Sequence, residues 1–143
     1  MKKFVTMMIV ALVAVSASAA SIDWAVNLGR TGSFKDSTGA AMTGTIYLVL
    51  ADTTFNATTA EEFETQLTSA TLGTMAITAG KAPTTAATAT SDKLTAGTRY
   101  DYAIVVFDVA NSQYYMSAAN NQLAYTEGVD DAKQITFTAA QAT

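Results

Sequence analysis

The stretch SIDWAVNL, residues 21–28, alternates apolar side chains with polar or small ones. Its apolar positions are Ile22, Trp24, Val26 and Leu28. An alternation with a period of two residues predicts a β-strand that buries one face and exposes the other. The same period recurs through most of the chain, so this stretch sets the expected fold class.

Further short segments rich in Thr, Val, Ile and Tyr follow at intervals of about ten residues, separated by Gly, Asn and Pro, which is typical of an all-β sandwich. The predicted strands cover residues 46–51, 74–78, 85–90, 102–109, 113–118, 122–126 and 135–137. Segments 46–51 and 102–109 are apolar on both faces. This pattern predicts central strands that are covered by the core on one side and by a helix or loop on the other.

One segment, residues 59–70, follows the helical period instead. Thr59 and Glu62 have the spacing of a capping box, and Phe63 and Leu67 fall on one face of the predicted helix. We expect a short surface helix whose apolar side chains cap the sandwich.

Residues 1–20 have the pattern of a signal peptide. Lys2 and Lys3 precede an apolar run over residues 4–15, and Ala17-Ser18-Ala19 fits the cleavage site. A membrane-spanning helix needs roughly 20 apolar residues, so this run is too short. The alternatives are a retained membrane helix and a pilin-type N-terminal helix. We predict cleavage after Ala19 or Ala20, a single domain over residues 21–143 without a membrane span, and a secreted or cell-surface location.

The charge balance disfavours nucleic acid and anionic membranes as partners. The full chain has 8 basic and 12 acidic residues, and cleavage would remove Lys2 and Lys3, changing the formal net charge from −4 to −6. Binding to polyanions needs clustered Lys and Arg.

The chain contains no Cys and no His. This composition excludes disulfides, thiolate catalysis, Cys-bound metals and histidine-dependent catalysis. A glycosidase-type carboxylate pair is conceivable, but Asp101 and Asp108 lie at opposite ends of one predicted strand, about 23 Å apart at the usual rise. We therefore predict no catalytic residues, no cofactor and no enzymatic activity. A lack of disulfides in an exported chain also favours a bacterial source.

The segment around Gly128 is a candidate calcium site, because Glu127, Asp130 and Asp131 supply the oxygen ligands that calcium prefers. The segment lacks the alternating acidic spacing of a dedicated calcium loop. Solvated carboxylates are the favoured interpretation.

Tyr114 and Tyr115, with Tyr47 and Tyr125, could form a platform on which sugar rings stack. Neighbouring residues on a strand point to opposite faces, so only one of Tyr114 and Tyr115 can be external. Core packing of one and a single surface Tyr is the alternative.

The stretch LTAGTRY, residues 94–100, followed by the alternating segment 101–109, resembles the corner before strand F of fibronectin type III and related immunoglobulin-like domains. The resemblance covers residues 91–115. It implies an antiparallel β-sandwich in which Leu94, Gly97 and Tyr100 are structural, with the Tyr hydroxyl bonded to the backbone of the turn. The family's Trp on the second strand and its Pro-rich entry are missing.

Three classes of function follow. The first is a structural or adhesive cell-surface subunit whose partners are copies of itself or other surface proteins. Its specific form is self-assembly, in which the strand bearing Ile22, Trp24, Val26 and Leu28 completes a neighbour's sheet. The alternative is a module that binds a carbohydrate or a peptide, and an enzyme is the third.

Overall fold

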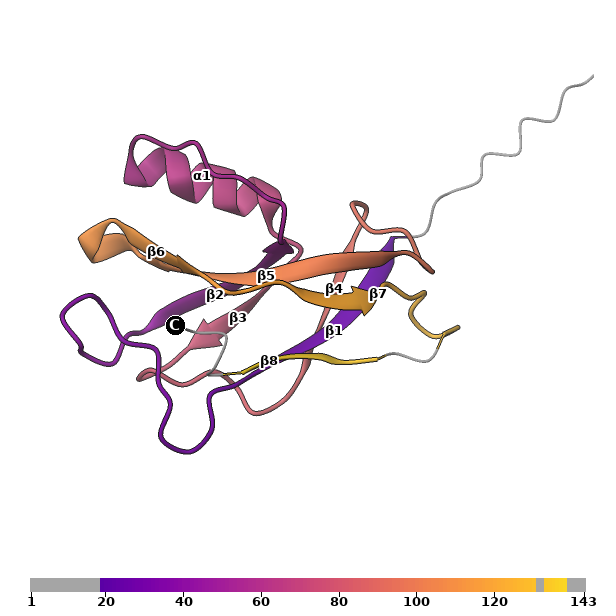
Figure 1. Cartoon of the computed structure of the whole chain (residues 1–143), viewed down its shortest axis with the longest axis horizontal. Coiled ribbons are helices and arrows are strands. Elements are labelled where there is room, and N and C mark those ends of the chain that lie inside the picture. The colour runs from indigo at the N-terminus through magenta and orange to yellow at the C-terminus, as the bar shows by residue number, and fades with distance from the viewer. Residues whose placement is uncertain (1–18, 131–132, 139–143) are drawn as a thin grey trace, which may run out of the picture.

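The computed structural model describes residues 19–130 and 133–138. This part of the chain is mostly β-strand, arranged in two sheets with one short α-helix, consistent with an all-β sandwich (Figure 1). The elements are β1 (Ala20–Asn27), β2 (Gly44–Leu50), α1 (Ala60–Ala70), β3 (Gly73–Ile77), β4 (Ala87–Ser91), β5 (Arg99–Asp108), a 3₁₀ turn (Val109–Asn111), β6 (Gln113–Met116), β7 (Asn120–Leu123) and β8 (Ile135–Thr138).

The predicted signal peptide lies outside the described residues, apart from Ala19 and Ala20. Ala20 is the first residue of β1 and is buried. No described helix has the length and apolar character that a bilayer crossing requires.

The smaller sheet has the order β4-β1-β8. β1 pairs with β4 in antiparallel fashion but with β8 in parallel fashion, with Trp24 opposite Ile135 and Val26 opposite Phe137. The expectation of a purely antiparallel sandwich was therefore wrong. Alternation specifies the buried face of a strand and not its direction, and β1 and β8 are separated by most of the chain, which allows the long crossover that parallel pairing needs.

The larger sheet has the order β3-β2-β5, and β6 and β7 both pair with β5 beyond it. β6 pairs with the C-terminal half of β5 and β7 with its N-terminal half. Ser117 lies between β6 and β7, where its hydroxyl accepts a hydrogen bond from the Ile104 amide at 3.0 Å and its own amide donates to the Ile104 carbonyl at 2.9 Å. The side chain of Ser117 thus maintains the pairing where the edge strand is interrupted.

The predicted strand over residues 122–126 is divided between the sheets. β7 ends at Leu123, and Tyr125 exchanges two backbone hydrogen bonds with Ser21 of β1, at 2.8 and 3.0 Å. The Asn120 side chain also donates to the Thr136 carbonyl of β8 at 3.1 Å. The chain therefore crosses between the sheets here, and hydrogen bonds join them along this side.

The main core lies between the two sheets. Its largest fully buried side chains include Trp24 of β1, Leu48 of β2, Tyr102 of β5 and Phe137 of β8. The indole N–H of Trp24 and the hydroxyl of Tyr102 are buried and have no hydrogen-bond partner among the described residues.

A second core lies on the outer face of the larger sheet, under α1 (Figure 1). Phe63 and Leu67 of the helix pack there against Val49 of β2 and Val105 of β5. This layer confirms the prediction from the two-sided apolar pattern of segments 46–51 and 102–109. The helix begins after Thr59, whose hydroxyl accepts from the Glu62 amide at 3.2 Å, as the capping-box spacing predicted.

The corner before β5 has a tight geometry. Leu94 is buried, Gly97 has a positive φ of 79°, and the Tyr100 hydroxyl accepts a hydrogen bond from the Thr95 amide at 3.0 Å. The positive φ at position 97 favours glycine because a Cβ would be strained there. The hydroxyl of Tyr100 thereby ties the start of β5 to the preceding turn.

Candidate functional site

The apolar residues predicted for self-assembly share the inner face of the smaller sheet. Ile22 and Trp24 are fully buried and Val26 is 7% exposed. Leu28 follows the end of β1 and packs against the main core while remaining partly exposed. β1 is hydrogen-bonded on both sides, so it is the central strand of its sheet.

A short segment, residues 28–33, joins β1 to the next anchored part of the chain. Gly29 has a positive φ of 70°, and its amide donates to the Asn27 side chain at 2.9 Å. The chain is anchored again at Phe34, which is buried and whose amide donates to the Gly80 carbonyl at 2.8 Å. Segment 28–33 is thus a turn between two fixed points.

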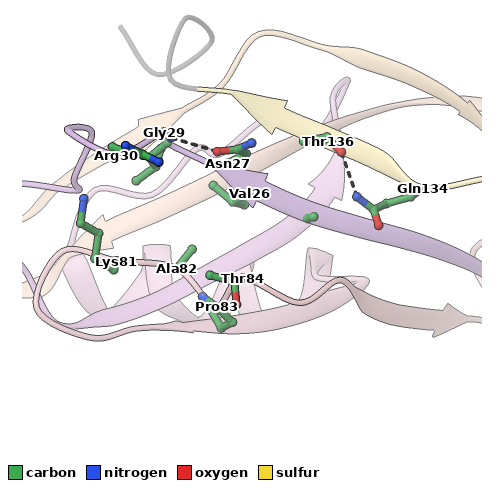
Figure 2. A pocket seen from close by; sticks show the side chains of 12 residues that line it. Val26, Asn27, Gly29, Arg30, Lys81, Ala82, Pro83, Thr84, Gln134 and Thr136 are labelled. Atoms are coloured by element: carbon green, nitrogen blue, oxygen red, sulfur yellow. Dashed lines mark hydrogen bonds between the residues drawn. The ribbon is translucent and has the colours of Figure 1, made fainter.

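A pocket with a volume of about 460 Å³ lies beside the end of β1 (Figure 2). Residues 25–30 of β1 and the following turn form one wall, residues 81–84 before β4 form another, and Gln134, just before β8, and Thr136 of β8 complete it. The pocket therefore lies where three segments distant in sequence come together.

The polar groups of this pocket are cationic or neutral. Arg30 and Lys81 lie at one end of it, as Figure 2 shows, and none of the described residues that line it is Asp or Glu. The Lys81 ammonium donates to the Gly32 carbonyl, and the Gln134 amide donates to the Thr136 hydroxyl at 3.0 Å. No hydrogen bond or ion pair joins the Arg30 guanidinium to another described residue.

Arg30 and Lys81 could not be recognised as a pair from the sequence, because they are far apart in the chain and belong to no motif. One shared signal precedes them: each directly follows a glycine with positive φ, Gly29 at 70° and Gly80 at 77°. Glycines in such turns leave the next side chain at the surface. That signal could not have indicated that the two turns meet.

The four tyrosines considered as a sugar platform do not come together. Tyr114 lies on the α1 side, 51% exposed, with its ring stacked on Phe63 at a centroid distance of 4.5 Å. Tyr115 is partly buried against the main core, in agreement with the predicted alternation of faces. Tyr125 is buried, and its hydroxyl donates to the Asp23 carboxylate at 2.8 Å. Tyr47 packs near the helix.

The candidate calcium ligands are only partly described, because Asp131 lies outside the described residues. Glu127 and Asp130 are exposed, and the Asp130 carboxylate accepts a hydrogen bond from the Thr126 amide at 2.8 Å within its own turn. Among the described residues, no group of three acidic side chains could hold a metal ion.

Asp108 lies close to Asp36, a proximity that the sequence did not indicate. Its carboxylate accepts from the Asn111 side chain at 2.7 Å and from the Ser37 amide at 3.4 Å, close to Asp36. The hydrogen bond from Asn111 lowers the pKa of Asp108, and the one from Thr38 lowers the pKa of Asp36. Both carboxylates therefore favour the charged form and stabilise turns.

The chain gives no significant match to protein-family models, to curated proteins or to solved structures.

Proposed function

We propose that this chain is an exported, non-enzymatic structural or adhesive subunit of a bacterial cell surface, which self-assembles when β1 of one copy takes the place of β1 in the next. The observation that carries the proposal is the position of β1. The first strand after the predicted leader is the central strand of its sheet and supplies four buried apolar side chains to the main core, namely those of Ala20, Ile22, Trp24 and Val26.

Exchange between copies would preserve these contacts, because an exchanged element is identical to the one it replaces. Burial of Ile22, Trp24 and Val26 is worth about 1.5–3 kcal/mol for each large side chain. The strand also pairs with β4 on one side and β8 on the other, so its absence would leave two unpaired edges. A sheet lacking β1 is thus a specific acceptor for that strand.

The segment that would open is short, and Leu28 at its start packs against the main core. Residues 28–33 contain Gly29 and Gly32, and the chain is anchored again at Phe34. Extension of this turn would let β1 leave its own sheet without moving β2. Short turns between packed elements are a usual place for exchange of an element between copies.

An immunoglobulin- or fibronectin type III-like fold is part of the proposal. The hydrogen bond from the Thr95 amide to Tyr100 supports it, since a Tyr hydroxyl bonded to backbone at the corner before a strand is typical of those domains. Such sandwiches serve mostly as scaffolds or binding modules.

The test uses a disulfide that reports which chain β1 belongs to. The hydroxyl oxygens of Ser21 in β1 and Thr90 in β4 lie 2.8 Å apart, so the double variant Ser21→Cys/Thr90→Cys places two thiols in contact in a chain with no other Cys. The full chain is exported from its leader, oxidised and separated on a denaturing gel without reductant. Exchange of β1 gives a ladder of covalent multimers.

The control is Thr45→Cys/Ala76→Cys, which joins opposite positions of β2 and β3. Neither strand is exchanged under the proposal, so this pair gives monomers in either case. If the Ser21/Thr90 pair also gives monomers alone, self-assembly through β1 is wrong.

A further inference from the structure

We infer that the pocket between β1, the segment 81–84 and β8 binds an acidic saccharide, with Arg30 and Lys81 taking its carboxylate or sulfate group. This inference goes beyond assembly through β1 and concerns the chain in which residues 28–33 keep their turn, because Arg30 and the Gly32 carbonyl lie in the segment that exchange would extend. It places a ligand site away from the tyrosines considered first.

The charge of the pocket is opposite in sign to the net charge of the chain. Acidic residues outnumber basic ones by 12 to 8 in the whole sequence, yet the described residues that line this pocket include two basic ones and no acidic one. The Arg30 guanidinium has no hydrogen-bonding or ionic partner among the described residues. Its planar fork matches a carboxylate or sulfate group with two parallel hydrogen bonds.

The second cation is held in position. The Lys81 ammonium donates to the Gly32 carbonyl. This hydrogen bond uses one of the three N–H groups of Lys81 and leaves the other two for a ligand. Figure 2 shows Arg30 and Lys81 on the same side of the pocket, on turns that come from different parts of the chain. An anion between them would meet positive charge from two sides.

The remainder of the pocket suits a sugar ring. Gln134, which precedes β8, Thr136 of β8 and Thr84 of the facing segment offer amide and hydroxyl groups, while the exposed Pro83 provides apolar surface. A saccharide presents the same combination, with hydroxyl groups around a ring whose faces are partly apolar. The volume of about 460 Å³ falls in the ordinary range for small-ligand sites.

The experiment measures binding of tetragalacturonic acid to the purified chain by calorimetry, with neutral maltotetraose, inorganic sulfate and a tetra-aspartate peptide as the other probes. We expect saturable binding of the acidic sugar that weakens as salt is raised, because salt screens exposed charges. Arg30→Gln removes charge-assisted hydrogen bonds and should weaken this binding about 10- to 100-fold.

The matched control is Arg99→Gln, which makes the same change at an exposed arginine at the start of β5, outside this pocket. It should leave the affinity within about twofold of the parent chain, because Arg99 does not line the pocket and salt screens exposed charges. Equal loss in both variants would show attraction to the overall surface and would overturn the inference. Binding of maltotetraose, or of the peptide or sulfate as tightly as the acidic sugar, would also overturn it.

Discussion

Gly73 of β3 and Ala89 of β4 approach so closely that a Cβ at position 73 would lie 2.7 Å from the Ala89 Cβ. The two strands belong to different sheets, so this contact closes the sandwich on the side away from β7 and β8. The same added atom would lie 3.7 Å from the Trp24 indole nitrogen. The absence of a side chain at position 73 therefore sets how near the two edges lie.

Gly73→Ala should destabilise the protein by about 1–3 kcal/mol, the usual cost of overpacking a filled core. Urea unfolding would measure the change. The double variant Gly73→Ala/Ala89→Gly removes the opposing methyl group and should recover most of the loss, because it has one strand glycine at these two positions, as the parent chain has. A double variant as unstable as the single one would contradict the contact as its cause.

Tyr102→Phe should stabilise the protein near neutral pH, because the buried hydroxyl of Tyr102 has no hydrogen-bond partner in the described part of the chain and an unsatisfied polar group costs about 1–3 kcal/mol. Thermal unfolding at pH 7 would show a higher Tm. Tyr125→Phe is the control: that hydroxyl is bonded to Asp23 at 2.8 Å, so its removal should lower the Tm.

The free energy of unfolding should fall at alkaline pH because of Tyr102. Burial raises the pKa of Tyr102 to about 12, above its ordinary value of 10.0. Between pH 10 and about 12 the folded state keeps the Tyr102 proton that the unfolded state loses. The contribution of Tyr102 to the free energy of unfolding is therefore complete below pH 10 and is lost as the pH rises toward 12. Tyr102→Phe should flatten the decline of unfolding free energy over this interval, and an unchanged slope would contradict this assignment.

Tyr100→Phe should lower the free energy of unfolding by about 1 kcal/mol, since it removes the acceptor of the Thr95 amide at the corner before β5. Tyr114→Phe provides the comparison, because Tyr114 is half exposed and its hydroxyl makes no hydrogen bond to another described residue. Chemical denaturation of both variants would separate a bonded hydroxyl from a solvated one. Equal effects would deny the corner its structural role.

Thr59→Ala should destabilise the protein by about 1 kcal/mol through loss of the N-cap of α1. The same substitution at Thr65, in the middle of that helix, should have little effect or a slight benefit, because alanine favours helix and the Thr65 hydroxyl only bonds back to the Glu61 carbonyl. Urea unfolding of the pair measures the cap against helix propensity. A Thr65 variant less stable than the Thr59 variant would contradict the capping role.

The sequence indicated which segments are strands because their alternation depends only on each segment's own environment. The buried faces that carry Trp24 and Phe63 could be predicted for this reason, as could the opposite orientation of Tyr114 and Tyr115, though not which of the two is buried. The direction of β8 beside β1 could not, since parallel and antiparallel neighbours bury the same face. The hydrogen bonds between Tyr125 and Ser21, which move the predicted strand 122–126 partly into the other sheet, depend on a crossing that no local pattern encodes.

The candidate pocket could not be predicted from the sequence, for a related reason. Arg30 and Lys81 stand in separate turns, and only the packing of β1 against its neighbours brings these turns to one place. Tyr114 and Tyr115 were conspicuous because they are adjacent in sequence, but adjacency on a strand separates side chains. Chemistry formed by distant segments becomes visible only after the strands are placed.

The short segment 28–33 holds β1 close to its own β4 and β8, so β1 would compete with the β1 of another copy for the place between them. A strand held by so short a link has an effective concentration in the millimolar range or above, so a finished monomer would resist invasion by another copy at ordinary protein concentrations. Under the proposed exchange, timing would decide the product: a chain that meets its neighbour before its own β1 docks would join the assembly, and a chain whose β1 docks first would remain a monomer. A growing assembly would also be polar. The copy at one end would have no strand between its β4 and β8, and the β1 of the copy at the other end would be unpaired.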